Sequence, residues 1–294
     1  MKKNKKNCSV DTAVIPIAGL GTRFLPLSKI IPKEMFPLGS KPIVQYVVEE
    51  AIEAGIKRII FVISPKKLDI FKRYILNYFK EDEELVAILK ERKKKEALSS
   101  LKCIPRVKYA YVIQRKPKGD GDAILKVKKL IERRKPFLVL FGDDISLPPH
   151  PQKSKEGVIS KGMASEIIEV YKKVKAPVLC LYKMPKEKLK SYGVPKVKGI
   201  KDRIYQIEGL IEKPDPKEAP SNFALVGKYV LTYEVFDYLE KIEAQNGEII
   251  LANALRKMIE EGKKIYGIQT KNKWIECGTK EKWMENFEIF SKLD

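Results

Sequence analysis

A short apolar run that breaks into a pair of glycines limits most strongly how this chain can fold. Residues 13–17 read AVIPI, a pattern that predicts a buried strand, and Gly19-Leu20-Gly21-Thr22-Arg23 follows at once. Glycines carry no Cβ, so the backbone can approach a ligand, and the N–H groups of such a turn form a concavity for phosphate oxygens. The segment therefore predicts a strand that ends in a phosphate-binding turn.

The glycine pair alone matches neither of the common phosphate-binding motifs. A P-loop has Lys-Ser/Thr directly after its second glycine, and the dinucleotide motif GxGxxG has glycine where this chain has Phe24. By itself the pair is equally compatible with a tight turn into a helix. Arg23 and Lys33 add the positive charge that binding of a polyphosphate requires.

Strand and helix patterns alternate through the first half of the chain. This alternation predicts an α/β fold with a mostly parallel, mixed sheet that has helices on both faces. The expected strands of this half are 58–63, 109–114 and 137–141, and the expected helices are 43–54, 67–99 and 123–133. In the less regular second half, we expect strands at 178–183, 205–211, 224–231 and 265–270, and helices at 163–172, 235–242, 249–261 and from 280.

A segment rich in proline, glycine and lysine at 148–162 divides the chain into two halves. We interpret this segment as a surface loop and not as a linker between domains. The sequence then predicts one Rossmann-like three-layer domain over 1–294, with a first half at about 11–147 and a second at about 163–294.

The chain is strongly basic, with 59 Lys and Arg against 38 Asp and Glu, and a net charge of +21. A basic surface is typical of nucleic-acid binding, which would give a steeply salt-dependent affinity. However, the lysines alternate with glutamates, and no basic stripe contains aromatic residues. We therefore expect no nucleic-acid partner. The composition also suits a heat-stable protein. Its positive electrostatic field would attract small anions such as nucleotides and sugar phosphates.

Neither a membrane span nor a secretory signal is evident, so we expect a cytoplasmic protein without a membrane partner. The four cysteines are far apart and form no C-x-x-C pair, which argues against structural zinc and favours reduced thiols. The single histidine, His150, lies among prolines. A mechanism with a histidine base is therefore disfavoured.

A longer ordered string follows the glycine turn: Pro26, then Pro32-Lys33-Glu34-Met35, Pro37 and Lys41-Pro42. With the turn, it resembles the signature of the sugar-1-phosphate nucleotidylyltransferases, and the Lys-Glu-Met is most similar to those that transfer a uridylyl group to glucose 1-phosphate. The resemblance extends from 13 to about 283. It implies a nucleotide-binding half followed by a sugar-binding half, and a homo-oligomer (a dimer or tetramer).

The resemblance also implies roles for individual residues. Those implied for catalysis are Arg23, Lys33 and Asp143. Those implied for nucleotide binding are Ala18, Gly19, Leu20, Gly21, Gln114 and Gly119. Those implied for sugar binding are Tyr192, Gly193, Glu212, Lys213 and Leu225, from three motifs in the family's order.

Asp143 and Asp144 end an apolar strand, where open α/β sheets bind ligands. Carboxylates there suit Mg²⁺, although acids in this position can also cap a loop or helix. The resemblance implies that Asp143 and Glu276 hold Mg²⁺. The chain departs from the family at three places: Glu276 replaces Asp, Asp122 replaces a polar uncharged residue or His, and the helix start at 246–249 lacks the family's usual acid and Thr. Asp144 also stands in a position that is usually apolar.

In the implied reaction, glucose 1-phosphate attacks the α-phosphorus of UTP in line, and UDP-glucose and pyrophosphate form. The attacking phosphate has a second pKa of about 6, so it needs no general base. Catalysis then consists of positioning and charge neutralisation. The alternatives are transfer of a thymidylyl group, use of another sugar phosphate, or a non-catalytic sensor of sugar nucleotides.

Overall fold

The structure of the protein is a computed structural model that describes residues 9–65, 68–71, 78–79, 82–102, 107–149 and 161–292. Cys8, Cys103 and His150 lie outside the described residues, as does most of the loop expected at 148–162. No helix in the described part of the chain is long and apolar enough to cross a membrane.

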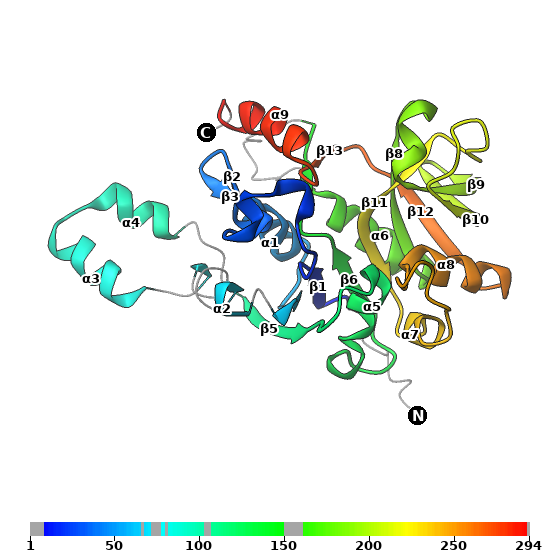
Figure 1. The fold of residues 1–294 in the computed structure, drawn as a ribbon, viewed down its shortest axis with the longest axis horizontal. Coiled ribbons are helices and arrows are strands. Elements are labelled where there is room, and N and C mark those ends of the chain that lie inside the picture. Colours follow the sequence, from blue (N-terminus) through cyan, green and yellow to red (C-terminus); the bar gives the residue numbers. More distant parts are fainter. Residues whose placement is uncertain are drawn as a thin grey trace.

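A nine-stranded sheet forms the centre of the molecule, in the order β5-β4-β1-β6-β11-β8-β12-β10-β9 (Figure 1). Its strands are β1 (Thr12–Pro16), β4 (Arg58–Ile63), β5 (Lys108–Ile113), β6 (Phe137–Leu140), β8 (Val178–Lys183), β9 (Gly193–Lys201), β10 (Ile204–Glu212), β11 (Phe223–Leu231) and β12 (Ile265–Gln269). The four strands from β5 to β6 are parallel, as are β8 and β12. The other neighbours are antiparallel, so the expected mixed sheet is confirmed.

Two small antiparallel ribbons lie outside the main sheet. One pairs β2 (Pro37–Leu38) with β3 (Lys41–Pro42), and the other pairs β7 (Asp144–Leu147) with β13 (Lys273–Glu276). The second ribbon brings the end of the chain beside the residues that follow β6. Its register places Glu276 opposite Asp144.

Helices cover both faces of the sheet, as expected for three layers (Figure 1). They are α1 (Ile43–Glu53), α2 (Leu68–Ile70), α3 (Glu83–Glu91), α4 (Lys95–Lys102), α5 (Gly119–Leu125), α6 (Met163–Val174), α7 (Val235–Leu239), α8 (Leu251–Glu260) and α9 (Lys280–Phe290). Helices α1 and α6 contribute to the core on one face, and α5, α7 and α8 contribute to the core on the other.

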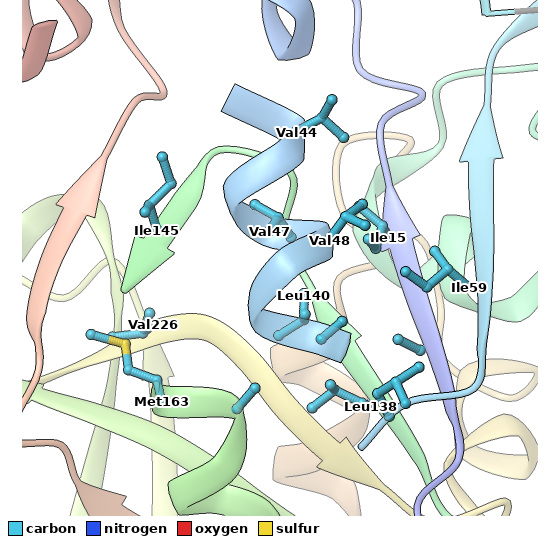
Figure 2. Close-up of a cluster of buried hydrophobic side chains, with 14 of the residues drawn as sticks. Ile15, Val44, Val47, Val48, Ile59, Leu138, Leu140, Ile145, Met163 and Val226 are labelled. Atoms are coloured by element: carbon cyan, nitrogen blue, oxygen red, sulfur yellow. The ribbon is translucent and has the colours of Figure 1, made fainter. Parts of the chain in front are cut away.

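Alternate residues of the central strands enter the two cores. Ala13 and Ile15 of β1 lie in the same core as α1, whereas Val14 lies in the core with α5. Figure 2 shows Val47 and Val48 of α1 over the strand residues Ile15, Leu138 and Leu140. Side chains of successive strand residues point to opposite faces, and β1 is apolar throughout because both of its faces are buried.

Some expected boundaries are wrong. The helix expected over 67–99 is interrupted: α3 and α4 are separate, with Lys93 between them in the left-handed region (φ 54°), and both extend away from the sheet (Figure 1). The helix expected at 123–133 begins at Gly119 and ends at Leu125 as α5. Its start is fixed by a tertiary contact, since Gly121 N–H donates to the Ile249 carbonyl (2.9 Å). Strand β9 was not expected.

Candidate active site

Two adjacent cavities of about 470 and 270 Å³ share part of their lining. The shared residues are Asp120, Phe141, Asp143, Glu212, Lys213 and Ile250. The first cavity is also lined by Ala18, Gly19, Leu20, Gln114 and Gly119. The second is also lined by Arg23, Tyr192, Gly193, Leu225 and Glu276. Of the residues expected to bind nucleotide, all but Gly21 line the first cavity, and the residues expected to bind sugar line the second.

The glycine turn after β1 shapes one wall of the first cavity. Gly21 is in the left-handed region (φ 66°), which favours glycine, and its carbonyl accepts a hydrogen bond from Ser28 Oγ (2.7 Å). Gly19 differs, because a Cβ built there would meet no atom within 4 Å. The protein itself leaves room for a side chain at this position, so the open space beside Gly19 is available to a ligand.

Asp143, which lines both cavities, forms an ion pair with Lys33, which lies behind it and lines neither cavity. Lys33 begins the short 3₁₀ turn Lys33–Met35, and Asp143 follows β6. Burial by itself would raise the pKa of Asp143, but the charges of Lys33 and Arg23 hold it below the ordinary value. The pKa of Lys33 is raised by Asp143 in spite of burial. Both groups therefore carry their charges at neutral pH.

Asp144, the residue in a usually apolar position, is held by groups of the protein. Its carboxylate accepts hydrogen bonds from Trp274 Nε1 (2.7 Å) and Gly227 N (3.1 Å). Burial and the neighbouring charge of Asp143 raise its pKa to about 7, against the effect of Lys228. The close approach to Gly227 requires glycine, since a Cβ there would lie 2.2 Å from Asp144 Oδ2.

A buried lysine, Lys228, holds the backbone at Asp144 through hydrogen bonds. Lys228 on β11 is 0% exposed, and its Nζ donates to the Asp144 carbonyl (2.8 Å) and to Glu50 Oε2 (2.6 Å). The other oxygen of Glu50 accepts from Ser146 Oγ (2.6 Å) and Ala164 N (2.8 Å). The network ties α1 and α6 to β7, which begins directly after Asp143.

Two carboxylates approach one another at the end of the β7–β13 ribbon. Asp143 Oδ2 and Glu276 Oε1 lie 3.2 and 3.3 Å from the position that a Cβ at Gly278 would take. The other Glu276 oxygen accepts from Tyr192 Oη (2.5 Å) and pairs with Lys282 Nζ. Figure 1 shows β13 leading into α9, the helix that carries Lys282.

These two carboxylates fit the donor set that Mg²⁺ takes when substrate phosphates supply its remaining ligands. Within the described ranges, no group of three or more His, Cys, Asp and Glu residues is arranged to hold a metal ion. A cation at this place would therefore be held jointly by Asp143, Glu276 and a bound phosphate. The longer Glu276 is accommodated because Gly278 leaves its carboxylate room beside Asp143.

Gln114, which lines the first cavity, is fixed by its neighbours. It is 5% exposed, and its Nε2 donates to the Gly119 carbonyl (3.0 Å) and to Asp122 Oδ2 (2.8 Å). Asp122 is 4% exposed, and its other oxygen pairs with Lys126 (2.9 Å). Although Asp122 departs from the family pattern, it does not line the cavity, so its charge lies away from the space for a triphosphate.

In the second cavity, Glu212 faces Gly193 across the β9–β10 pair. A Cβ at Gly193 would lie 3.1 Å from Glu212 Oε2 and 3.2 Å from Leu225 Cδ1, so glycine keeps this wall open. Burial raises the pKa of Glu212, as does the charge of Asp120, whereas Lys213 Nζ at 3.6 Å lowers it. This carboxylate can accept hydrogen bonds from sugar hydroxyl groups.

Several lining residues were not expected from the sequence. Asp120 lies in both cavities, and one of its oxygens accepts from Gly121 N (2.8 Å) and Leu251 N (3.0 Å). Trp274 lines the second cavity, and Lys282 reaches Glu276 from α9. No local sequence pattern pointed to these residues, because long-range pairing of β13 and packing of α8 bring them to the site.

The chain is similar to known proteins over most of its length. Residues 12–292 match the nucleotidyl transferase family. The chain is 34% identical to the UTP–glucose-1-phosphate uridylyltransferase of Pseudomonas aeruginosa over 94% of each chain. It is 33% identical to UTP–glucose-1-phosphate uridylyltransferase 2 of Streptococcus pyogenes, over 94% of this chain and 88% of the relative.

Solved structures give the same result. A UDP-glucose pyrophosphorylase complexed with UDP-glucose superimposes with a TM-score of 0.83 and 31% identity, over 97% of this chain and 100% of the other. A UTP-bound enzyme of this kind from Acinetobacter baumannii superimposes with a TM-score of 0.83 and 30% identity, over 97% and 95% of the two chains. The chain therefore belongs to the nucleotidyl transferase family, and within it to the UTP–glucose-1-phosphate uridylyltransferases.

Proposed function

We propose that this protein transfers the uridylyl group of UTP to glucose 1-phosphate, giving UDP-glucose and pyrophosphate. The observation that carries the proposal is the Lys33–Asp143 pair, whose carboxylate lines both cavities where they meet. One substrate in each cavity would bring its reacting phosphate to this junction. The names of the relatives support UTP over dTTP, which makes transfer of a thymidylyl group the weaker alternative.

The first cavity would hold UTP. The turn from Ala18 to Gly21 would offer backbone N–H groups to the phosphates, and Arg23, which lines the adjoining second cavity, would add positive charge. Gln114 and Gly119, which also line this cavity, would contact the base. We assign nucleotide binding mainly to residues 11–147 of the single domain.

The second cavity would hold glucose 1-phosphate, mainly through residues 163–294. Glu212 would accept hydrogen bonds from two hydroxyl groups, and Gly193 would let the backbone approach the ring. Tyr192 and Leu225 complete the wall, and Lys213 would pair with the sugar phosphate. Glu212 and Lys213 also line the first cavity, so the halves form one continuous site.

The chemical difficulty is repulsion between two polyanions. Two like unit charges 4 Å apart repel by about 4 kcal/mol at an effective dielectric of 20. Lys33 and Arg23 offset this repulsion at the junction, and they hold the attacking phosphate oxygen in line with the bond to pyrophosphate. Asp143 and Glu276 would hold Mg²⁺, which supplies further positive charge between the phosphates.

Three further expectations accompany this proposal. The protein is expected in the cytoplasm, as a dimer or tetramer, and without a nucleic-acid partner. Salt-dependent binding to DNA or RNA, measured beside the enzyme assay, would test the last of these.

Release of pyrophosphate, measured over a matrix of nucleotides and sugar phosphates with Mg²⁺, tests the function. We expect the highest kcat/KM for UTP with glucose 1-phosphate. A higher kcat/KM with dTTP would replace the proposal by a thymidylyltransferase. Tight UTP binding without turnover on any sugar phosphate would identify a sensor.

A further inference from the structure

Gln114 presents only one kind of hydrogen-bonding group to the first cavity. Its amide nitrogen has two hydrogens, and these are donated to the Gly119 carbonyl and to Asp122 Oδ2. Both partners are acceptors only, so the amide group cannot be turned around without placing oxygen against oxygen. The amide oxygen, which has no hydrogen-bond partner among the described residues, is left on the side of the cavity that Gln114 lines.

Asp122 enforces this orientation more strongly than Gly119 does. Its carboxylate is almost fully buried, and its two oxygens have separate donors: Oδ1 takes Lys126 Nζ at 2.9 Å, and Oδ2 takes Gln114 Nε2 at 2.8 Å. A buried carboxylate facing an amide oxygen would lose this hydrogen bond and add repulsion between two acceptors. The orientation of Gln114 therefore depends on the charge of Asp122.

A fixed acceptor distinguishes one class of pyrimidine from the other. Uracil carries a hydrogen on N3 and donates it, whereas N3 of cytosine has no hydrogen and is an acceptor. Cytosine in the same place would set its N3 against the Gln114 oxygen and leave both unpaired. Sites built on such a hydrogen bond reject the mismatched analogue strongly, since buried polar groups are then unpaired.

We infer that Asp122 is a positioning residue for base selection: it locks Gln114 with its amide oxygen toward the base, so that the site takes a pyrimidine with N3–H and rejects cytosine. The inference rests on the proposed function. It also assigns a role to Asp122, which departs from the family pattern. Because thymine has the same N3–H, this device does not separate UTP from dTTP.

Asp122→Asn tests the inference with little change in shape. Asn has one side-chain oxygen, for which Lys126 and Gln114 must compete. When the oxygen of Asn at position 122 faces Lys126, its NH₂ group points at Gln114. That NH₂ group then favours the reversed orientation of the Gln114 amide, with the Gln114 oxygen turned away from the cavity. We expect wild-type protein to prefer UTP over CTP in kcat/KM by at least ~100-fold, and Asp122→Asn to lower this ratio by at least ~10-fold. An unchanged ratio would overturn the inference.

A double variant separates orientation from general damage. In Asp122→Asn/Lys126→Met the competing donor is gone, so the Asn oxygen is free to accept from Gln114. We expect the UTP/CTP ratio to return toward the wild-type value, and Lys126→Met alone to keep it. Failure of the double variant to recover selectivity would overturn the inference.

Asp237→Asn is the control, since the same substitution is made at an exposed carboxylate of α7 that lines neither cavity and does not bind Gln114. It should leave the UTP/CTP ratio unchanged, whatever its effect on rate; an equal loss of selectivity would overturn the inference. Calorimetric Kd values for UTP and CTP give the same ratio without turnover. A protein that binds UTP selectively but transfers nothing would refute the proposed function alone.

Discussion

Lys33 and Asp143 are 110 residues apart in the chain and form an ion pair, in which Asp143 lines both cavities. Lys33 lies in the connection that follows β1, and Asp143 follows β6, the strand beside β1 in the sheet. The pair therefore joins the ends of two neighbouring parallel strands. A lysine and an aspartate that neutralise each other in the free protein are available to a phosphate and a cation when substrate enters.

Removing either charge should abolish most of the activity. We expect Lys33→Ala and Asp143→Asn each to lower kcat by at least ~100-fold, the usual scale for one preorganised charge. Single-turnover kinetics with UTP and glucose 1-phosphate would measure the loss, and circular dichroism would show that the fold is kept. Lys29→Ala, at an exposed lysine in the same connection, is the control. Turnover equal to wild type in both charge variants would refute these roles.

Replacement of Glu276 should weaken the response to Mg²⁺. Because its Oε1 lies beside Asp143, Glu276→Gln is expected to raise the Mg²⁺ concentration for half-maximal activity by about tenfold, within the range found for groups that tune metal sites. Electron paramagnetic resonance of bound Mn²⁺, in the presence of UTP, would report the same change without turnover. Glu285→Gln, an exposed residue of α9, should behave as wild type.

The pH dependence of sugar binding should follow Glu212. Its pKa is raised by burial and by Asp120 and lowered by Lys213, so it takes up a proton at a higher pH than an ordinary glutamate. As the pH falls through this raised pKa, the hydroxyl acceptor is lost and KM for glucose 1-phosphate rises. Asp120→Asn should move the midpoint of this rise to lower pH, and Lys213→Met should move it to higher pH.

Titration of the phosphate of glucose 1-phosphate is common to the wild type and the two variants. Only the differences between their profiles of KM against pH are therefore compared. A shift of both variants in the same direction would contradict this assignment of the midpoint to Glu212.

Stability should depend on the buried Lys228–Glu50 pair. Lys228→Met leaves Glu50 buried without its cation, which is expected to cost about 3–5 kcal/mol in the free energy of unfolding. Lys263→Met breaks a pair with Glu234 in which both side chains are 43% exposed, and should cost much less of the free energy of unfolding. Urea denaturation would measure both, and similar losses in the two variants would contradict the argument. Glu50→Gln should restore part of the stability of Lys228→Met.

The central sheet and the phosphate end of the site could be predicted from the sequence because their signals are local. The strand at 13–17, the glycine turn and the pair of acids after β6 are each formed by residues that are adjacent in the sequence. Lys33 was recognised through a dense string of prolines and glycines. Where a motif is continuous in sequence, the chemistry of its residues can be assessed together.

Features made by tertiary contact could not be predicted. The start of α5 is fixed by the carbonyl of Ile249, and the pairing of Glu276 with Asp144 joins residues far apart in the chain. Asp122 stands where the family has a polar uncharged residue or His. Its direction, away from the cavity and against Gln114, depends on side-chain geometry that periodicity does not report.

The β7–β13 ribbon has a consequence for protein synthesis. Strand β7 acquires its partner only when Lys273–Glu276 has left the ribosome, by which time the phosphate turn and the acids after β6 have long been made. Any fragment that ends before Lys273 therefore leaves β7 without its partner strand and lacks Glu276.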